Sequence, residues 1–458
     1  MPFRCCCALL VLSAGIAARV AALDTPRGVV FVTLDTTRAD HLGCYGYPRG
    51  TSAFTDRLAR EGVLFEHAYA PASHTAPSHA SMFTSLYPAQ HGVTANGQAF
   101  PDVEAKPQGY TTLAEMFGGA GYRTAAFTSV AFLKGLARGF SHLDLGGGRG
   151  YRQADATVQA AIEWARQLGP TERFFVWIHL FDAHGPSRAP AGHLEALRFA
   201  SPAAADAFAD EAWSKWGVPR AYFKSATDLA DRYRKYDAEI HFADEQLARL
   251  FEEMQRTAQN RSTLWVVTAD HGEGLGNHSE WGHGRLLYGE QLQVPMVFWG
   301  NGLPAGVREA SLVRLVDLMP TLAALIGKDA AQPGFASQGR SLLPLLTRGG
   351  GLAPTRAFAQ RRPPDKARRL WERGDVFAVF DLDWKYIVHS QGEDEFYDLR
   401  KDPLELANLV KSPSHVKDRL ASLARETWAS LRREGSKLAD RPVDPTTEEE
   451  LRALGYLN

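Results

Sequence analysis

Residues 29–35 read VVFVTLD, a continuous run of β-branched and apolar residues that ends at a carboxylate. Such a run is typical of a strand buried on both faces, and here it delivers Asp35 to the C-terminal end of that strand. The pattern occurs twice more, at residues 174–180 (FFVWIHL) and 264–268 (LWVVT). The three runs predict a buried sheet.

Polar residues follow each of these strands within a few positions. They are Asp35, Asp182, His184, Asp270 and His271. Patterns of helical periodicity lie between the strands, at residues 55–61, 154–167 and 229–254. Strands that alternate with helices predict an α/β fold, with a large and mostly parallel sheet between helices. Because ligands bind beyond the carboxyl ends of such strands, we expect the polar residues to form a site.

The last quarter of the chain has a different pattern. Glycines 349–351 and the prolines around 363–364 are typical of a linker, and two strand-like segments (376–380 and 384–388) and a helix (414–434) follow. We therefore predict a catalytic domain over residues 23–345 and a small α+β C-terminal subdomain over residues 356–458. Residues 190–212 are rich in alanine and predict a helical insertion.

Composition narrows the kind of partner. The chain has 458 residues and a formal net charge of −1, with acidic and basic residues interspersed. It therefore lacks the electrostatic pattern expected for binding nucleic acid or an anionic membrane. A small-molecule or glycan substrate is the expectation.

The N-terminus is typical of a signal peptide. Arg4 precedes an apolar run over residues 5–18, and the small residues Ala21 and Ala22 follow. This predicts cleavage after residue 22, export to the periplasm or the extracellular space, and no transmembrane segment in the mature chain; a retained anchor is the alternative. Only Cys44 would remain, so an internal disulfide is excluded.

Residues 73–85, SHTAPSHASMFTS, carry the most chemistry. A hydroxyl followed by Pro77 fits the start of a helix. A helix N-terminus also concentrates free N–H groups and positive dipole, so Thr75 can be both a structural residue and a nucleophile beside an anion site.

These segments resemble the sulfatase family of the alkaline-phosphatase superfamily. The similar segments, in family order, are residues 30–35, 38–46 (RADHLGCYG), 58–65 (LAREGVLF), 77–78, 86–93 (LYPAQHGV), 270–273 (DHGE), 294–295, 317–322 (DLMPTL) and 396–403 (FYDLRKDP). The resemblance covers nearly the whole mature chain. It implies an alkaline-phosphatase-like α/β fold and metal-dependent hydrolysis of a sulfate or phosphate ester.

The chain departs from the sulfatase pattern at the nucleophile. The family places Cys or Ser there and converts it to formylglycine, whereas this chain has Thr75. Threonine cannot give an aldehyde, because its β-carbon also carries a methyl group. Thr36 replaces the second Asp after the first strand, and residues 123–130 replace the family's Lys-Trp-His segment.

A metal-bound threonine nucleophile is the rule in related branches, including phosphodiesterases and phosphoethanolamine transferases. The resemblance implies that Asp35, Thr75, Asp270 and His271 bind a divalent metal ion. Three oxygens and one imidazole nitrogen favour zinc or manganese. Calcium is the alternative, and it is less favoured because it prefers more oxygen ligands.

Imidazoles are the candidates for the remaining chemistry. We predict that Thr75, His184 and His283 are catalytic and that His79, His184, His283 and Arg285 bind the ester oxygens. His74 and His278 are left open. Residues interpreted as structural are Arg38, Asp40, His41, His67, His179, His241 and His389. Two alternatives remain: a soluble phosphoryl- or phosphoethanolamine-type transferase, and a catalytically silent binding protein.

Overall fold

The computed structural model describes residues 23–101, 110–146, 150–256, 262–331, 338–347, 350–362, 373–435, 443–454 and 456. The predicted signal peptide and the prolines at 363–364 lie outside these residues. The main helices are α1 (Ala53–Glu61), α2 (Thr75–Thr84), α4 (Leu113–Gly119), α5 (Ala154–Ala165), α6 (Ala191–Ala196), α7 (Pro202–Lys215), α8 (Ala226–Arg256), α10 (Leu318–Leu325), α12 (His415–Gly435) and α13 (Pro445–Ala453).

The large sheet has nine strands in the order β11-β2-β10-β6-β1-β5-β3-β4, and β9 pairs with β2. Its strands are β1 (Gly28–Leu34), β2 (Val63–Tyr69), β3 (Arg123–Thr128), β4 (His142–Leu145), β5 (Phe174–Leu180), β6 (Thr263–Ala269), β9 (Gln293–Val294), β10 (Met296–Gly300) and β11 (Val307–Arg314). The central strand β1 is parallel to β5 and β6, whereas β10 is antiparallel to both of its neighbours. The predicted α/β fold with a mostly parallel sheet is confirmed.

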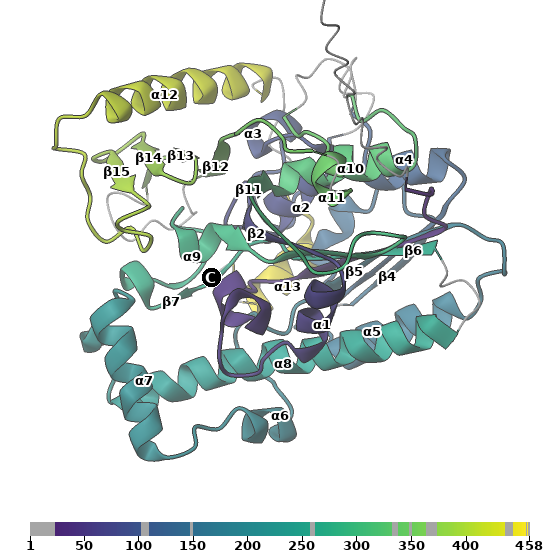
Figure 1. Cartoon of the computed structure of the whole chain (residues 1–458), viewed down its shortest axis with the longest axis horizontal. Coiled ribbons are helices and arrows are strands. Elements are labelled where there is room, and N and C mark those ends of the chain that lie inside the picture. Colours follow the sequence, from purple (N-terminus) through teal and green to yellow (C-terminus); the bar gives the residue numbers. More distant parts are fainter. Residues whose placement is uncertain are drawn as a thin grey trace, which may run out of the picture.

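Helices cover both faces of this sheet (Figure 1). Helices α1, α5 and α8 pack together on one face, and α2, α4 and α10 lie on the other. Strands β1, β5 and β6 are buried along their whole length. This explains their continuous apolar sequence, because each strand has a helical layer on either side. The predicted helical insertion forms two helices, α6 and α7.

A separate four-stranded antiparallel sheet follows, with the order β12-β13-β14-β15. Its strands are Ala357–Arg361, Val376–Phe380, Trp384–His389 and Glu395–Asp398, and α12 packs against β13 and β14. The chain then returns to the large sheet, where α13 contacts the short helix η4 (Phe132–Leu136). The division into domains at 345 and 356 stays a prediction.

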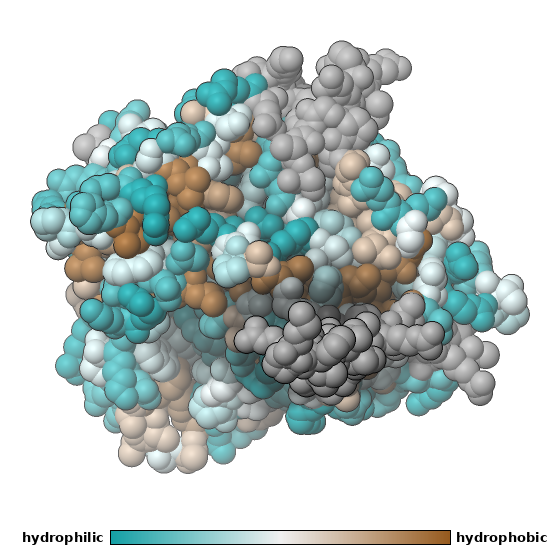
Figure 2. All heavy atoms as spheres, turned by 45° about the horizontal axis from the view of Figure 1, so that its top comes forward, coloured by the Kyte–Doolittle hydropathy of each residue, from teal (hydrophilic) through white to brown (hydrophobic). Residues whose placement is uncertain are grey.

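The surface gives no sign of a membrane-spanning element in the described part of the chain. None of the described helices is long and apolar enough to cross a bilayer. On the face shown in Figure 2, hydrophobic and hydrophilic residues are interspersed.

Candidate active site

Two neighbouring strands bring the predicted metal ligands together. Leu34 of β1 lies opposite Ala269 of β6, so the residues that follow them, Asp35 and Asp270, lie side by side. One ligand atom from each of Asp35, Asp270 and His271 lies within 4.8 Å of the other two. The register of parallel strands therefore builds the cluster that the sequence predicts.

Thr75, the first residue of α2, reaches this cluster from the helical layer that α2 forms with α4 and α10. Its Oγ1 is 3.4 Å from His271 Nε2. Thr75, Asp35, Asp270 and His271 are all 0 % exposed. The start of a helix places positive dipole beside the hydroxyl, which favours a negatively charged oxygen there, although the Ala76 N–H already donates to Asn96 Oδ1 at 2.9 Å.

Hydrogen bonds fix the orientation of His271 and Asp270. His271 Nδ1–H donates to the carbonyl oxygen of Gly272 at 2.9 Å, so the Nε2 lone pair faces Thr75. Asp270 Oδ1 accepts from the backbone N–H groups of Thr36 and His271, at 3.2 and 2.9 Å. Thr36 adopts a φ of 51°, a costly conformation for a β-branched residue, and Tyr236 O–H donates to its carbonyl at 2.6 Å. This strained conformation directs the N–H group of Thr36 toward Asp270 Oδ1.

The carboxylate of Asp35 fits a cation. Neither of its oxygens receives a hydrogen bond from the described residues, although both are buried. Burial and the neighbouring Asp270 raise the pKa of Asp35 well above its ordinary range. Two buried carboxylates side by side are costly without a positive charge. Two carboxylates, a hydroxyl and a free imidazole nitrogen therefore fit a divalent metal of the zinc or manganese type.

His79 lies beneath the cluster rather than in an open cavity. Its Nδ1–H donates to the carbonyl oxygen of Thr75 at 2.8 Å, and its Nε2 is 2.9 Å from Thr33 Oγ1. Substrate binding by His79 stays a prediction, but two internal hydrogen bonds favour a role in holding Thr75 in place.

His184 and His283 lie together at the edge of the cluster. Their ring centroids are 4.9 Å apart, and the His283 ring is 4.5 Å from that of His271. Burial lowers the pKa of His184 to about 3, with a further contribution from His283, and burial beside His271 lowers the pKa of His283 well below its usual range. Both imidazoles are therefore neutral at pH 7.

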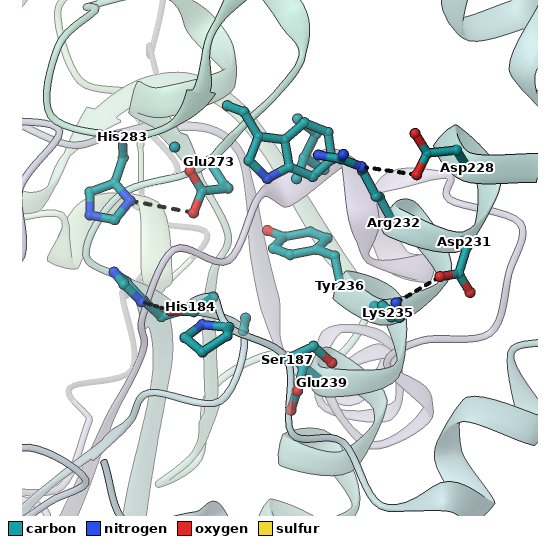
Figure 3. Close-up of a pocket in the computed structure, with 16 residues that line it drawn as sticks. His184, Ser187, Asp228, Asp231, Arg232, Lys235, Tyr236, Glu239, Glu273 and His283 are labelled. Atoms are coloured by element: carbon teal, nitrogen blue, oxygen red, sulfur yellow. Dashed lines mark hydrogen bonds and ion pairs between the residues drawn. The ribbon is translucent and has the colours of Figure 1, made fainter. Parts of the chain in front are cut away.

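A cavity of about 540 Å³ opens beside these two histidines. Its inner end is formed by His184, His283 and Glu273, and its outer wall comes from α8 (Figure 3). Ion pairs line that wall: Lys235 with Asp231 at 2.7 Å and Arg232 with Asp228 at 3.4 Å. The rim is thus polar and carries both signs of charge. Arg285 is not among the residues that line the cavity, and it pairs with Glu280 at 3.1 Å.

Sequence reasoning missed three residues of this site. Glu273 Oε2 is 3.3 Å from His283 Nδ1, and burial raises the pKa of Glu273 to about 7. His179, interpreted as structural, places Nε2 3.3 Å from Asp35 Oδ2. Its signal was its place at the end of β5, beside Thr33 of β1. Tyr456 reaches the site from the C-terminus, and no pattern in the sequence marked it.

His278, left open above, links the active-site loop to the small sheet. Its Nδ1 is 2.8 Å from Glu290 Oε1, and its Nε2 is 3.0 Å from the carbonyl oxygen of Glu405. Burial opposes its charge, but the hydrogen bond and charge of Glu290 raise the pKa of His278 above 6.5. Both ring nitrogens then donate.

This pair predicts a pH dependence of stability. A raised pKa means that the contribution of His278 is fully present below pH 6.5 and is lost as the pH rises through the folded-state value. His278→Gln should therefore lower the thermal midpoint at pH 6, and the difference from the parent should shrink toward pH 9. A difference that stays constant over this range would contradict the charged pair.

Comparisons with known proteins agree with the geometry. The sulfatase family model matches residues 27–328. A Delta 4,5-hexuronate-2-O-sulfatase of Bacteroides thetaiotaomicron is 26 % identical over 433 residues, which cover 83 % of this chain and 85 % of the relative. Two solved structures share the fold. One is a phosphonate monoester hydrolase of Agrobacterium radiobacter, with a TM-score of 0.71, 21 % identity and coverage of 90 % of this chain and 96 % of the other.

The second structure is of a protein in complex with its substrate D-glucosamine-2-N,6-O-disulfate. It has a TM-score of 0.72 and 19 % identity, and the match covers 91 % of this chain and all of the other. Fold and family thus define a hydrolase that acts on sulfate or phosphate esters, with a buried polar cluster at the carboxyl ends of parallel strands. The chain belongs to the sulfatase family of the alkaline-phosphatase superfamily. The predicted family and ester-hydrolase class are confirmed.

Proposed function

We propose that the protein cleaves a sulfate or phosphate ester through a covalent intermediate on unmodified Thr75, with a divalent metal held by Asp35, Thr75, Asp270 and His271. The observation that carries the proposal is the 3.4 Å approach of Thr75 Oγ1 to the free nitrogen of His271, within a buried group of two carboxylates. A divalent ion bound there would lower the pKa of the Thr75 hydroxyl and offset negative charge on the ester oxygens.

Other parts of the chain activate and orient Thr75 for the reaction. The start of α2 favours negative charge on Oγ1, and His79 fixes the backbone of Thr75. Oγ1, after losing its proton to solvent, forms a bond to sulfur or phosphorus while the bond to the leaving oxygen breaks. Water then attacks the same atom, which releases sulfate or phosphate and restores the Thr75 hydroxyl.

The leaving oxygen needs a proton, and the floor of the cavity provides the groups for it. His283 Nδ1 faces Glu273, so Nε2 is the nitrogen that can face the ester. The carboxyl group of Glu273, whose pKa burial raises to about 7, can pass a proton to His283 Nδ1 as the Nε2–H of that neutral ring protonates the leaving oxygen. His184 is the second member of this pair; its Nδ1–H donates to the carbonyl oxygen of Gly185, so its Nε2 lone pair is the group that can accept a proton.

The group attached to the ester is proposed to be a glycan or another polar small molecule. The mixed charges of the cavity wall and the exposed Trp281 ring at its edge suit hydroxyl-rich ligands. The related hexuronate sulfatase acts on such a compound. Transfer to an acceptor other than water is the second candidate, because the transferases that the Asp35, Thr75, Asp270, His271 set resembles also use a threonine.

One experiment tests the proposal directly. The metal-loaded protein is incubated with chromogenic sulfate monoesters, phosphate monoesters, phosphate diesters and phosphonate esters. The best substrate is then used for a rapid quench followed by intact-mass and peptide analysis. We expect an adduct of sulfate or phosphate mass on the peptide that contains Thr75. An adduct on another residue, or turnover without any adduct, would assign the nucleophile elsewhere.

We also propose export to the periplasm or the extracellular space, on the basis of the N-terminal pattern. N-terminal sequencing of the native protein should find a start near residue 23. A cytoplasmic protein that retains Met1 would contradict this.

A further inference from the structure

Helix α13 and Tyr456 are anchored beside Thr75. Helix α13 begins at the N-cap Asp444, whose side chain accepts from the N–H of Thr447 and pairs with Lys134 at 2.9 Å. Glu450 Oε1 accepts from the N–H of Ala131 at 2.6 Å, and Leu451 belongs to the main hydrophobic core. These contacts fix the position at which the following residues enter the site.

Tyr456 extends from this helix to the catalytic groups. Its hydroxyl is 2.8 Å from His184 Nε2 and 3.5 Å from Thr75 Oγ1. Its ring packs edge-on against Phe132, with centroids 5.7 Å apart. A residue near the C-terminus thus contacts both the proposed nucleophile and a histidine of the cavity.

The direction of the hydrogen bond follows from the other nitrogen of His184. Nδ1–H donates to the carbonyl oxygen of Gly185 at 2.6 Å, so Nε2 carries the lone pair. Tyr456 O–H is therefore the donor. A phenolic donor 3.5 Å from the attacking oxygen can reach an oxygen of a tetrahedral group bonded to it.

The hydroxyl groups at the end of β3 do not take the position of the Tyr456 hydroxyl, because they bond elsewhere. At the end of β3, Thr128 Oγ1 donates to the carbonyl oxygen of Val130 at 2.6 Å, and Ser129 Oγ is 3.1 Å from Thr157 Oγ1. Phe132 follows and provides the surface on which the Tyr456 ring rests. Tyr456 therefore supplies a hydroxyl group on a side of Thr75 where the segment after β3 presents the apolar ring of Phe132.

We propose that Tyr456 is a catalytic residue that donates its hydrogen bond to an oxygen of the sulfate or phosphate group transferred to Thr75. This rests on the proposed function of Thr75. In the free enzyme the O–H bonds to His184; when the ester binds, the anionic oxygen is the stronger acceptor, and the bond moves to it. The Nε2 lone pair of His184 is then exposed to the cavity and can accept a proton.

Tyr456→Phe tests this, because it keeps the ring on Phe132 and removes only the hydroxyl. We expect kcat/KM for the best ester to fall on the order of a hundredfold, the typical loss of one donor to a transition-state oxygen. The Kd of inorganic phosphate for the metal-loaded protein should rise about tenfold, as expected for a lost bond to a charged acceptor. The matched control is Arg452→Ala, an exposed residue of the same helix, which should leave both values unchanged.

A second variant, deletion of residues 456–458, separates donation from obstruction. We expect it to lose at least as much as Tyr456→Phe. If the deletion raises kcat/KM and tightens phosphate binding, the tyrosine only blocks the site and the proposal is overturned. It is equally overturned if Tyr456→Phe matches the parent in both measurements.

The same titration in a Thr75→Ala background keeps this proposal distinct from the proposed function. Phosphate binding does not require the nucleophile, so Tyr456→Phe should weaken it there as well. A fully active Thr75→Ala enzyme would refute the nucleophile without altering this binding result. An inactive Thr75→Ala enzyme whose phosphate affinity is indifferent to Tyr456 would refute only the tyrosine.

Discussion

Thr75→Ala should lower turnover of the best ester on the order of a thousandfold or more, because the covalent route through Oγ1 is lost. Thr75→Ser should keep part of the activity, since it retains a hydroxyl at the start of α2. Steady-state and single-turnover rates on the metal-loaded proteins measure both. Thr84→Ala, at the other end of α2, is the matched control and should keep the parental mechanism.

The same variants also distinguish attack by Thr75 from direct attack by water on the ester. If Thr75→Ala remains active, water attacks the ester directly and the threonine is a ligand or a helix-terminal residue only. If Thr75→Ser is inactive while folded and metal-loaded, the methyl group of Thr75 is needed to orient the hydroxyl. Melting curves of the variants establish that each is folded.

Asp270→Ala should abolish tight metal binding. Its carboxylate is buried against Asp35, and both share the site with His271. Loss of even an outer partner of a ligand lowers metal affinity roughly 10- to 100-fold, so loss of a direct ligand should exceed that. Elemental analysis after dialysis measures the metal content. Asp228→Ala, on the outer wall of the cavity, is the control and should carry as much metal as the parent.

The metal prediction has a clear contrary outcome. If Asp270→Ala carries the parental amount of metal, the ligand assignment is wrong. In either case, the divalent ion found in the parent protein identifies the preferred metal without an activity assay. Zinc or manganese is expected from the oxygen-rich set with one imidazole.

Much of this architecture could be predicted because buried parallel strands have a strong local signature. β1, β5 and β6 are buried at every position and mostly apolar, and the chain places polar residues within a few positions of their ends. Their adjacency then follows from the geometry of a parallel sheet, and so does the meeting of Asp35 with Asp270. The confirmed fold class and family rest on these signals together.

The rest could not be predicted, because it depends on contacts between distant segments. β10 runs antiparallel between β2 and β6, an orientation that no local periodicity encodes. His179 lies next to Asp35 only because β5 is the neighbour of β1. Tyr456 is separated from Thr75 by 381 residues, and the short helix α13 that carries it has no pattern that points to an active site. The metal ligands, the domain boundaries and the catalytic roles stay predictions.

The return of the C-terminus to the nucleophile has a consequence for how the protein is made. The described residues around Thr75 run from Asp35 to Tyr456, so the site gains Tyr456 only after residue 456 has left the ribosome. A chain that stops a few residues early can still bury the large sheet and its helices, yet it lacks the phenol beside Thr75.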